Sequence, residues 1–246
     1  MRDMTIDLNA DVAEGADDAA LYEIVTSVNV ACGAHAGNEN AMRSAIERAR
    51  SLGVAIGAHP GYPDRETMGR RRLTMAPYDV ERMLVEQIST LRRIAASMGA
   101  RVRHVKPHGA LYNQAAGDTL LARAVAAAVA AVDSALTLVG LAGGAMLDAG
   151  RAAGLAVAAE AFCDRGYRAD GTLVPRGEPG ALIDDPVRAA AQALAVARGA
   201  PVVAGSGTVL VRADTICLHG DSPGAVATAS AVRDALEAAG VRLAAP

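Results

Sequence analysis

One recurring pattern, a short apolar run that ends in polar side chains, constrains this chain more than any other feature. Four of the five histidines follow such a run, and they are His35, His59, His108 and His219. β-Branched residues favour strands, and a neighbouring glycine or proline tends to end them. The pattern therefore predicts several strands that each stop where a reactive side chain begins.

Residues 102–113 are the clearest example of this pattern. Two valines favour a strand, Pro107 cannot donate a hydrogen bond to a ladder, and Gly109 allows a sharp turn. Lys106 and His108 are then presented at the carboxyl end of the strand. A salt-bridged lysine and a capping histidine would explain these two residues alone, but the repetition elsewhere favours a site.

Helical patterns alternate with the expected strands along most of the chain. Helix, glycine and strand follow one another with almost no linker at Gly53, Gly99, Gly154 and Gly199. Such alternation is typical of parallel βαβ units with right-handed crossovers. The expected strands are residues 5–8, 28–31, 54–57, 102–106, 137–141, 156–160 and 215–218.

Polar clusters follow six of these strands, which distinguishes between two α/β architectures. An open doubly wound sheet gathers its ligand groups at one switch point that only a few strands serve. Six contributing strands imply a ring instead. We therefore predict a TIM-like parallel β/α barrel of seven or eight strands with the site at its carboxyl end, and keep an open α/β sheet as the alternative.

The remaining elements are expected as follows. Helices are predicted near residues 18–27, with Asp17 and Asp18 as caps, and at 39–52, with Asn38 as N-cap. An irregular stretch at 161–183 is long enough to be a functional lid. Further helices are expected at residues 77–98, 118–132, 185–198 and 223–239, and a hairpin around 205–207.

Composition limits the class of protein and its partners. The chain has 246 residues, of which 52% are hydrophobic, so we expect a single domain spanning 1–246. A net charge of -3 gives no reason to expect nucleic acid or a membrane as partner. The start of the chain lacks the apolar core of a signal peptide, and the most apolar run, 124–132, is too short to span a bilayer. We expect a cytoplasmic protein that acts on a small metabolite.

The predicted site contains carboxylates, imidazoles and one ammonium group. Carboxylates beside neutral imidazoles suit acid–base work on a carbonyl, or a divalent metal with a hydrolytic water, and the sequence leaves both open. Lys106 could stabilise an oxyanion or bind a carboxylate or phosphate group. The predicted catalytic residues are Asp7, Asp11, His35, His59, Lys106 and His108. The predicted substrate-binding residues are Arg65, Arg70, Asn113, Asp164, Arg165, Tyr167, His219 and Asp221.

Six motifs in register resemble the LamB/YcsF family along essentially the whole chain. That resemblance implies a β/α barrel related to glycoside hydrolases and polysaccharide deacetylases. It also implies the A subunit of a prokaryotic 5-oxoprolinase, which opens 5-oxo-L-proline to L-glutamate with ATP as co-substrate and together with B and C subunits. Ala13 departs from the family, where glycine is more frequent. The motifs are residues 7–11, 29–37, 57–60, 106–112, 164–167 and 218–221.

The resemblance gives the candidate residues provisional roles. The lactam is a stable amide. Phosphorylation of its carbonyl oxygen would make the carbonyl carbon electrophilic enough for water to attack. Lys106 would neutralise the developing charge, and His108 or His59 with Asp11 would act as base and acid. Arg165 or Arg65 would clamp the substrate carboxylate.

The sequence leaves the nucleotide site and the exact reaction open. No GxxxxGK[ST] motif occurs, so nucleotide recognition would have to be unconventional or shared with a partner. Two other functions are compatible with the same residues: a metal-dependent deacetylase or amidohydrolase acting without ATP, and a lactam-binding subunit without catalytic activity. The sequence is also compatible with a bound divalent metal and with a homo-oligomer.

Overall fold

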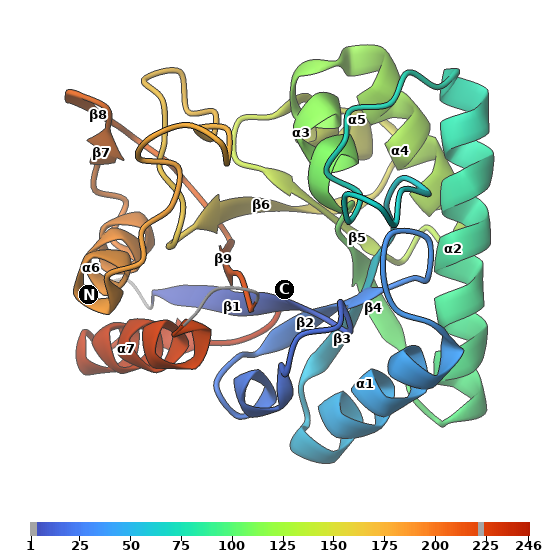
Figure 1. The fold of residues 1–246 in the computed structure, drawn as a ribbon, viewed down its shortest axis with the longest axis horizontal. Coiled ribbons are helices and arrows are strands. Elements are labelled where there is room, and N and C mark those ends of the chain that lie inside the picture. The colour runs from blue at the N-terminus through green and yellow to red at the C-terminus, as the bar shows by residue number, and fades with distance from the viewer. Residues whose placement is uncertain (1–3, 221–223) are drawn as a thin grey trace.

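Seven parallel strands close into a barrel in the computed structural model, which describes residues 4–220 and 224–246 (Figure 1). The strands follow chain order around the ring, and β9 closes it by pairing with both β6 and β1. This closure confirms the predicted barrel, and the open sheet was wrong. The barrel strands are β1 (Thr5–Val12), β2 (Ser27–Ala31), β3 (Ala55–His59), β4 (Val102–Val105), β5 (Thr137–Leu141), β6 (Ala156–Phe162) and β9 (Thr215–Leu218).

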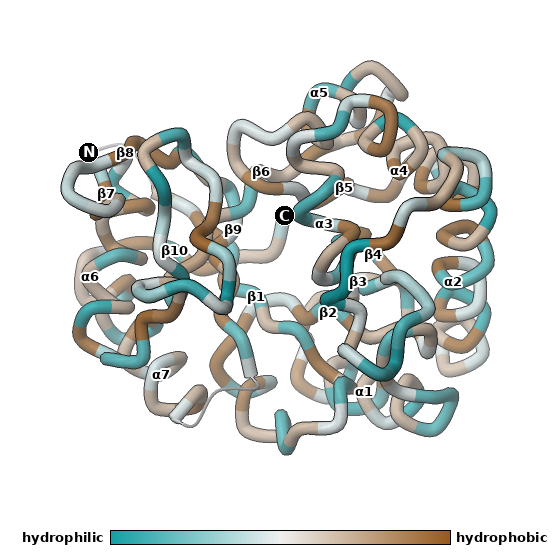
Figure 2. Tube along the Cα trace, turned by 45° about the horizontal axis from the view of Figure 1, so that its top comes forward, coloured by the Kyte–Doolittle hydropathy of each residue, from teal (hydrophilic) through white to brown (hydrophobic). Residues whose placement is uncertain are grey.

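Helices pack around the outside of the barrel (Figure 1). Asn38 caps α1 by accepting a hydrogen bond from the Ala41 backbone N–H, and Gly53 ends that helix in the left-handed conformation, as predicted. Hydrophilic and hydrophobic residues alternate along α1 and α2, as expected for helices with one face on the barrel (Figure 2). The helices are α1 (Glu39–Leu52), α2 (Pro77–Ser97), α3 (Gly109–Gly117), α4 (Thr119–Val132), α5 (Ala145–Ala152), α6 (Pro186–Ala197) and α7 (Ala225–Ala238).

The first strand is longer than predicted, and this changes which carboxylate reaches the site. We expected it to end at residue 8, but β1 continues to Val12. Asp7 therefore lies near the amino end of β1, whereas Asp11 lies near its carboxyl end. Side chains alternate between the two faces of a strand, so Asp7, Asn9 and Asp11 share the face that lines the barrel interior.

The helix predicted at residues 18–27 is replaced by a short 3-10 helix, η1 (Ala19–Glu23). Asp18 does not cap it through its side chain, which instead accepts a hydrogen bond from the Ala13 backbone N–H at 2.7 Å. That contact ties the turn after β1 to the start of η1. The capping role predicted for Asp18 was therefore wrong, although the residue still fixes local structure.

A long irregular segment follows β6, as predicted for residues 161–183. Tyr167 anchors it through backbone bridges to Leu173 and Ala204. The predicted hairpin is present as two antiparallel strands, β7 (Val202–Ala204) and β8 (Gly207–Val209), and it lies beside α6, apart from the barrel (Figure 1). A two-residue strand, β10 (Arg242–Leu243), adds to β1 outside the ring.

Within residues 4–220 and 224–246, no single helix is long and apolar enough to cross a membrane. The helices α3 and α4 pass the same length and composition test only as a pair, and that pair is bent by 119°.

Candidate active site

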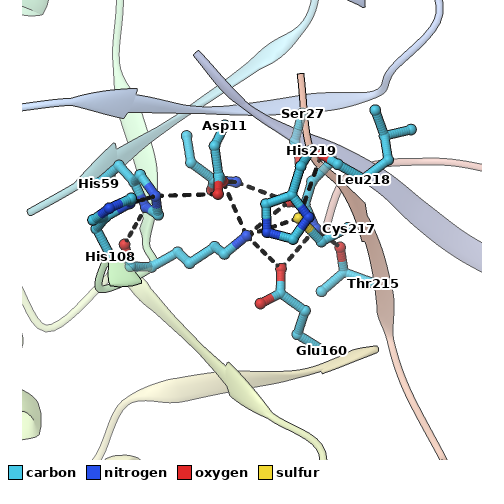
Figure 3. A network of polar contacts seen from close by, with 12 residues as sticks. Asp11, Ser27, His59, His108, Glu160, Thr215, Cys217, Leu218 and His219 are labelled. Atoms are coloured by element: carbon cyan, nitrogen blue, oxygen red, sulfur yellow. Dashed lines mark hydrogen bonds and ion pairs between the residues drawn. The ribbon is translucent and has the colours of Figure 1, made fainter. Parts of the chain in front are cut away.

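A pocket of about 360 Å³ opens at the carboxyl end of the barrel strands. Its floor is formed by residues at the ends of β1, β3, β4, β6 and β9, and Asp11, His59 and Lys106 among them belong to one polar network (Figure 3). The loop after β6 contributes Val174 and Arg176 to the wall. The floor residues are Asp11, His59, Lys106, Phe162 and His219.

Lys106, the only lysine in the chain, lies at the centre of this floor. Its Nζ is 2.9 Å from Asp11 Oδ1, 3.0 Å from Glu160 Oε1 and 3.0 Å from Cys217 Sγ. Burial alone would lower the pKa of Lys106, but the charge of Asp11, with smaller contributions from Cys217 and Glu160, outweighs it and raises the pKa well above its ordinary value. The side chain is therefore an ammonium group at neutral pH.

The two carboxylates that hold Lys106 are fixed by amide side chains inside the barrel. Asn29 Nδ2 donates to Asp11 Oδ1 at 2.9 Å and to Asn9 Oδ1 at 2.8 Å. Asn9 Nδ2 donates in turn to Glu160 Oε1 at 3.0 Å. The lysine, its partners and their supports thus form a continuous network, in which Lys106 is the counter-charge of both Asp11 and Glu160.

His104 extends the network below Lys106, on the same face of β4. Its Nε2 donates to Asn29 Oδ1 at 2.8 Å, and burial lowers the pKa of His104 to about 3. Gly57 lies opposite His104 in the β3–β4 register, and a Cβ at that position would overlap the imidazole ring. The glycine therefore makes room for a neutral histidine inside the barrel.

Three further histidines gather around Glu14 at one side of the pocket. His35 and His108 stack with their ring centroids 3.8 Å apart, and each places a nitrogen 3.0 Å from Glu14 Oε1. Burial would raise the pKa of Glu14, but the hydrogen bonds from His108 and His35 outweigh it and lower that pKa. Burial lowers the pKa of His35 to about 4, so this ring is neutral.

His59 links this histidine group to the lysine network. Its Nε2 is 3.2 Å from Asp11 Oδ2 and 2.9 Å from His108 Nδ1. Burial would lower the pKa of His59, yet the charge of Asp11 outweighs it and raises that pKa. The pKa of Asp11 lies well below its ordinary value, because His59 and Lys106 together outweigh the opposing effect of burial. The site thus supplies a carboxylate, an ammonium group and protonatable imidazoles within one pocket.

His219 and Asp164 form a separate pair at the end of β9. Asp164 accepts hydrogen bonds from the His219 backbone N–H at 2.8 Å and from its Nδ1 at 2.9 Å. Burial would raise the pKa of Asp164, but the charge of His219 outweighs it and lowers that pKa. Phe162, the only phenylalanine of the chain, stacks on His219 with centroids 5.6 Å apart. Asp164 thereby positions His219 from behind.

Most of the predicted site residues meet in this pocket, although their roles stay predictions. His35 and Asp164 lie behind pocket residues that they contact. Asp221 lies outside the described residues. The predicted residues that line the pocket are Asp11, His59, Arg70, Lys106, His108, Asn113, Arg165 and His219.

Asp7 is placed elsewhere, inside the barrel and towards its amino end. It accepts hydrogen bonds from the hydroxyl groups of Thr26 at 2.6 Å, Ser27 at 2.8 Å and Thr215 at 2.5 Å. Burial raises the pKa of Asp7. Because β1 extends four residues further than expected, the Asp7 carboxylate lies in a buried hydroxyl cluster and not at the pocket, and its catalytic role stays a prediction.

Three predicted substrate-binding residues hold the chain in place. Arg65 donates to the backbone oxygens of Gly33 and Gly37, at 2.6 Å each, and lines a neighbouring pocket. The Tyr167 hydroxyl is buried and accepts from the Phe162 backbone N–H at 2.7 Å.

Arg165 reaches the pocket wall, but it directs Nε to the Ala181 oxygen and Nη2 to the Val174 oxygen, which secures the loop after β6. The guanidinium groups of Arg65 and Arg165 thus contact backbone oxygens, and the substrate clamp expected at Arg165 or Arg65 stays a prediction.

Sequence reasoning missed several residues that build the site. Glu14 comes three residues after Asp11, just beyond the end of the first strand. Glu160 is the last residue of the strand expected at 156–160. Asn9 and His104 share a strand face with Asp11 and Lys106 respectively, so two-residue spacing was the signal that could have found them. The missed residues are Asn9, Glu14, Asn29, His104, Glu160, Phe162 and Cys217.

Known proteins resemble this chain along its full length. It is 51% identical over 250 residues to the A subunit of 5-oxoprolinase from Chloroflexus aggregans, covering 99% of both chains. It is 50% identical over 248 residues to the A subunit of 5-oxoprolinase from Methylococcus capsulatus, covering 98% of this chain and 95% of the relative.

Solved structures share the barrel. The crystal structure of a lactam utilization protein from Thermus thermophilus has a TM-score of 0.92 and 43% identity, covering 99% of this chain and 100% of that one. A putative cellobiose-phosphate cleavage protein from Enterococcus faecalis has a TM-score of 0.56 at 13% identity, covers 98% of this chain and 97% of that one, and shows the fold alone. The LamB/YcsF family model matches residues 6–246. With the predicted motifs, the barrel and these full-length similarities in agreement, the chain belongs to the LamB/YcsF family.

Proposed function

We propose that this protein is the A subunit of a prokaryotic 5-oxoprolinase, which opens 5-oxo-L-proline to L-glutamate with hydrolysis of ATP and together with B and C subunits. The observation that carries the proposal is the similarity along the whole chain to relatives that are named as A subunits of 5-oxoprolinase. The pocket at the carboxyl end of the barrel supplies chemistry that suits a cyclic amide.

A lactam carbonyl is a poor electrophile, so its opening needs help at the oxygen and at the attacking water. Lys106 is buried, charged and at the pocket floor, where it stabilises negative charge that develops on the carbonyl oxygen or on a phosphate attached to it. Electrostatic stabilisation of this kind is strong because little water screens the ammonium group.

Proton transfer is assigned to the neighbouring imidazoles. His59 Nε2 and His108 Nδ1 both lie beside a carboxylate oxygen, of Asp11 and Glu14 respectively. An imidazole held by a carboxylate can take a proton from an attacking water and return it to the leaving amide nitrogen. We assign His59 with Asp11 and His108 with Glu14 as the candidate acid–base pairs.

The substrate carboxylate is assigned to the arginine-rich wall of the pocket. Arg70, Arg72 and Arg176 line the wall together with Asn113. Guanidinium groups bind carboxylates through two parallel hydrogen bonds. This assignment replaces the clamp first expected at Arg65 and Arg165.

ATP is assigned to a site that this chain shares with its partners. The sequence contains no GxxxxGK[ST] motif, and Gly140–Gly144 lacks the lysine and hydroxyl that follow a P-loop. We therefore expect the isolated chain neither to open 5-oxo-L-proline nor to hydrolyse ATP in its presence.

The test is a coupled measurement of L-glutamate and phosphate with the chain alone, with the B and C subunits alone, and with all three. We expect both products to appear together only in the complete mixture. Robust ATP-dependent glutamate formation by the chain alone would contradict the shared enzyme. Hydrolysis without ATP that a divalent metal stimulates would favour the amidohydrolase alternative.

A variant separates catalysis from simple lactam binding in the same assay. Replacing His108 by Ala in the complete mixture is expected to lower turnover by about a hundredfold or more, the scale of a lost acid or base. A folded His108→Ala chain that supports wild-type turnover would favour a role in lactam binding without catalysis.

A further inference from the structure

Four side chains that line the pocket, those of Asp11, Glu14, His59 and His108, bring their acceptor atoms close together. His59 Nε2 lies 3.2 Å from Asp11 Oδ2 and 2.9 Å from His108 Nδ1. Glu14 Oε1 lies 3.0 Å from His108 Nδ1 and 3.7 Å from His59 Nε2. Both imidazoles are almost fully buried, with 1% and 4% exposure for His59 and His108. Water therefore cannot surround these nitrogens to keep the groups apart.

The far nitrogens of both rings fix where the ring protons are. His59 Nδ1 lies 2.7 Å from the Lys106 backbone oxygen, and His108 Nε2 lies 2.7 Å from the Met68 backbone oxygen. A carbonyl oxygen only accepts hydrogen bonds, so each of these nitrogens carries the hydrogen. When both rings are neutral, His59 Nε2 and His108 Nδ1 are both lone pairs that face each other and two carboxylates. The contact between His108 and Glu14 is then a hydrogen bond only when the His108 ring carries a second proton.

Lys106 pairs with Asp11 Oδ1 from outside this group. Within the described residues, the only positive charge available between Asp11 Oδ2, Glu14 Oε1 and the two ring nitrogens is therefore a proton on a ring. One shared proton satisfies only one of the contacts, either between the two imidazoles or between an imidazole and a carboxylate. A divalent ion among the four groups satisfies all of them and also neutralises the charges of Asp11 and Glu14. A metal-binding histidine typically donates its other N–H to a carbonyl or carboxylate, and both His59 and His108 do so here.

We propose that Asp11, Glu14, His59 and His108 bind a divalent transition-metal ion, with Zn²⁺ as the best match. Imidazole nitrogens and carboxylate oxygens are ligands that Zn²⁺ accepts, with metal–ligand distances of about 2.1 Å. In a tetrahedral site such bonds separate the ligand atoms by about 3.4 Å. The four separations given above, 2.9 to 3.7 Å, lie on both sides of that value.

The same four residues line the pocket, so the metal site opens towards the space assigned to substrate. A metal ion there would polarise the carbonyl oxygen of a lactam bound in this pocket. This catalytic use rests on the proposed function and would take the place of acid–base work by His59 and His108, because their far nitrogens are held by backbone oxygens and their near nitrogens would bind the ion. The binding of the metal does not rest on the proposed function.

Metal binding is tested on the purified full-length chain without lactam or partner subunits, so its outcome is independent of the proposed function. The chain is treated with a chelator, dialysed and titrated with Co²⁺, with visible absorption and calorimetry as readouts, and Zn²⁺ is then added as competitor. We expect one ion per chain, displaced by Zn²⁺. His59→Ala and His108→Ala are each expected to weaken binding by about a hundredfold or more, at least the scale of a disturbed metal site.

His219→Ala is the matched control, because His219 belongs to a different possible group with Asp11 and Cys217. It is expected to bind Co²⁺ as the wild type does. The proposal is overturned if the wild-type chain binds no ion, or if His219→Ala loses binding. A near-ultraviolet thiolate-to-cobalt band in the wild-type chain would also overturn it, and this readout needs no variant to fold.

Discussion

At the scale of single residues, the barrel interior of this protein is organised by buried polar groups. Lys106 stands between Asp11 and Glu160, and removing its charge would leave two carboxylates together in a buried site. Breaking a buried ion pair typically costs about 3–5 kcal/mol of stability. Lys106 therefore stabilises the fold and also lies in the pocket where it could contact substrate. A loss of activity on its replacement would not by itself identify a catalytic role.

His104 gives a pH prediction at the same scale. Its pKa is about 3 in the folded chain, against 6.5 for an unperturbed histidine. Between these values the unfolded chain binds a proton that the folded chain does not, so stability falls as pH falls. This proton contributes about 1.4 kcal/mol per pH unit to the slope of the unfolding free energy against pH. We expect His104→Gln to reduce the loss of unfolding free energy between pH 6 and pH 4 by that amount per unit.

Urea unfolding at a series of pH values measures this effect. Arg103→Gln, on the exposed side of the same strand, serves as the control and should keep the wild-type slope. A His104→Gln chain with an unchanged acid slope would show that His104 is not the neutral buried base described here.

At the scale of elements, the turn after β1 places Glu14 against the histidines. Ala13 has φ of 63°, a left-handed conformation that favours glycine, and its N–H is held by Asp18. A glycine would adopt this conformation without strain. We expect Ala13→Gly to raise the free energy of unfolding by about 1 kcal/mol, because the strain exceeds the extra flexibility of glycine in the unfolded chain.

Ala127→Gly in the middle of α4 is the matched control for this prediction. There the backbone is helical, so the same replacement should lower stability by about 1 kcal/mol. Thermal or urea unfolding compares the two variants directly. Equal destabilisation by both would mean that the turn at Ala13 is not strained.

The fold could be predicted largely from the sequence because strand, helix and glycine alternate so regularly. The end of β1 could not, since both faces of a barrel strand are buried and the polar residues Asp7, Asn9 and Asp11 face inward. The short 3-10 helix at Ala19–Glu23 replaced a predicted helix because Asp18 bonds back to Ala13. Hydrophobic periodicity predicts neither the extended end of β1 nor the short 3-10 helix.

At the scale of the whole molecule, the site is assembled from strands that lie far apart in the sequence. Polar ends on many strands were enough to predict a ring and to bring His59, Lys106 and His108 together. The contacts of Glu14 with the histidines depend on a turn, and those of Asn29 and Glu160 on the stagger between strands. The capture of Arg65 by two backbone oxygens likewise depends on loop geometry that motifs do not specify.

The central claim is that the lactam binds against Lys106, and the single lysine makes that claim directly measurable. The chain is labelled with ¹⁵N only at lysine, assembled with unlabelled B and C subunits, and observed by NMR without ATP. We expect one side-chain signal, from Lys106, that shifts saturably as 5-oxo-L-proline is added and stays in place with L-proline, which lacks the lactam carbonyl. A Lys106 signal that does not move, in an assembly that converts 5-oxo-L-proline once ATP is supplied, would contradict the account.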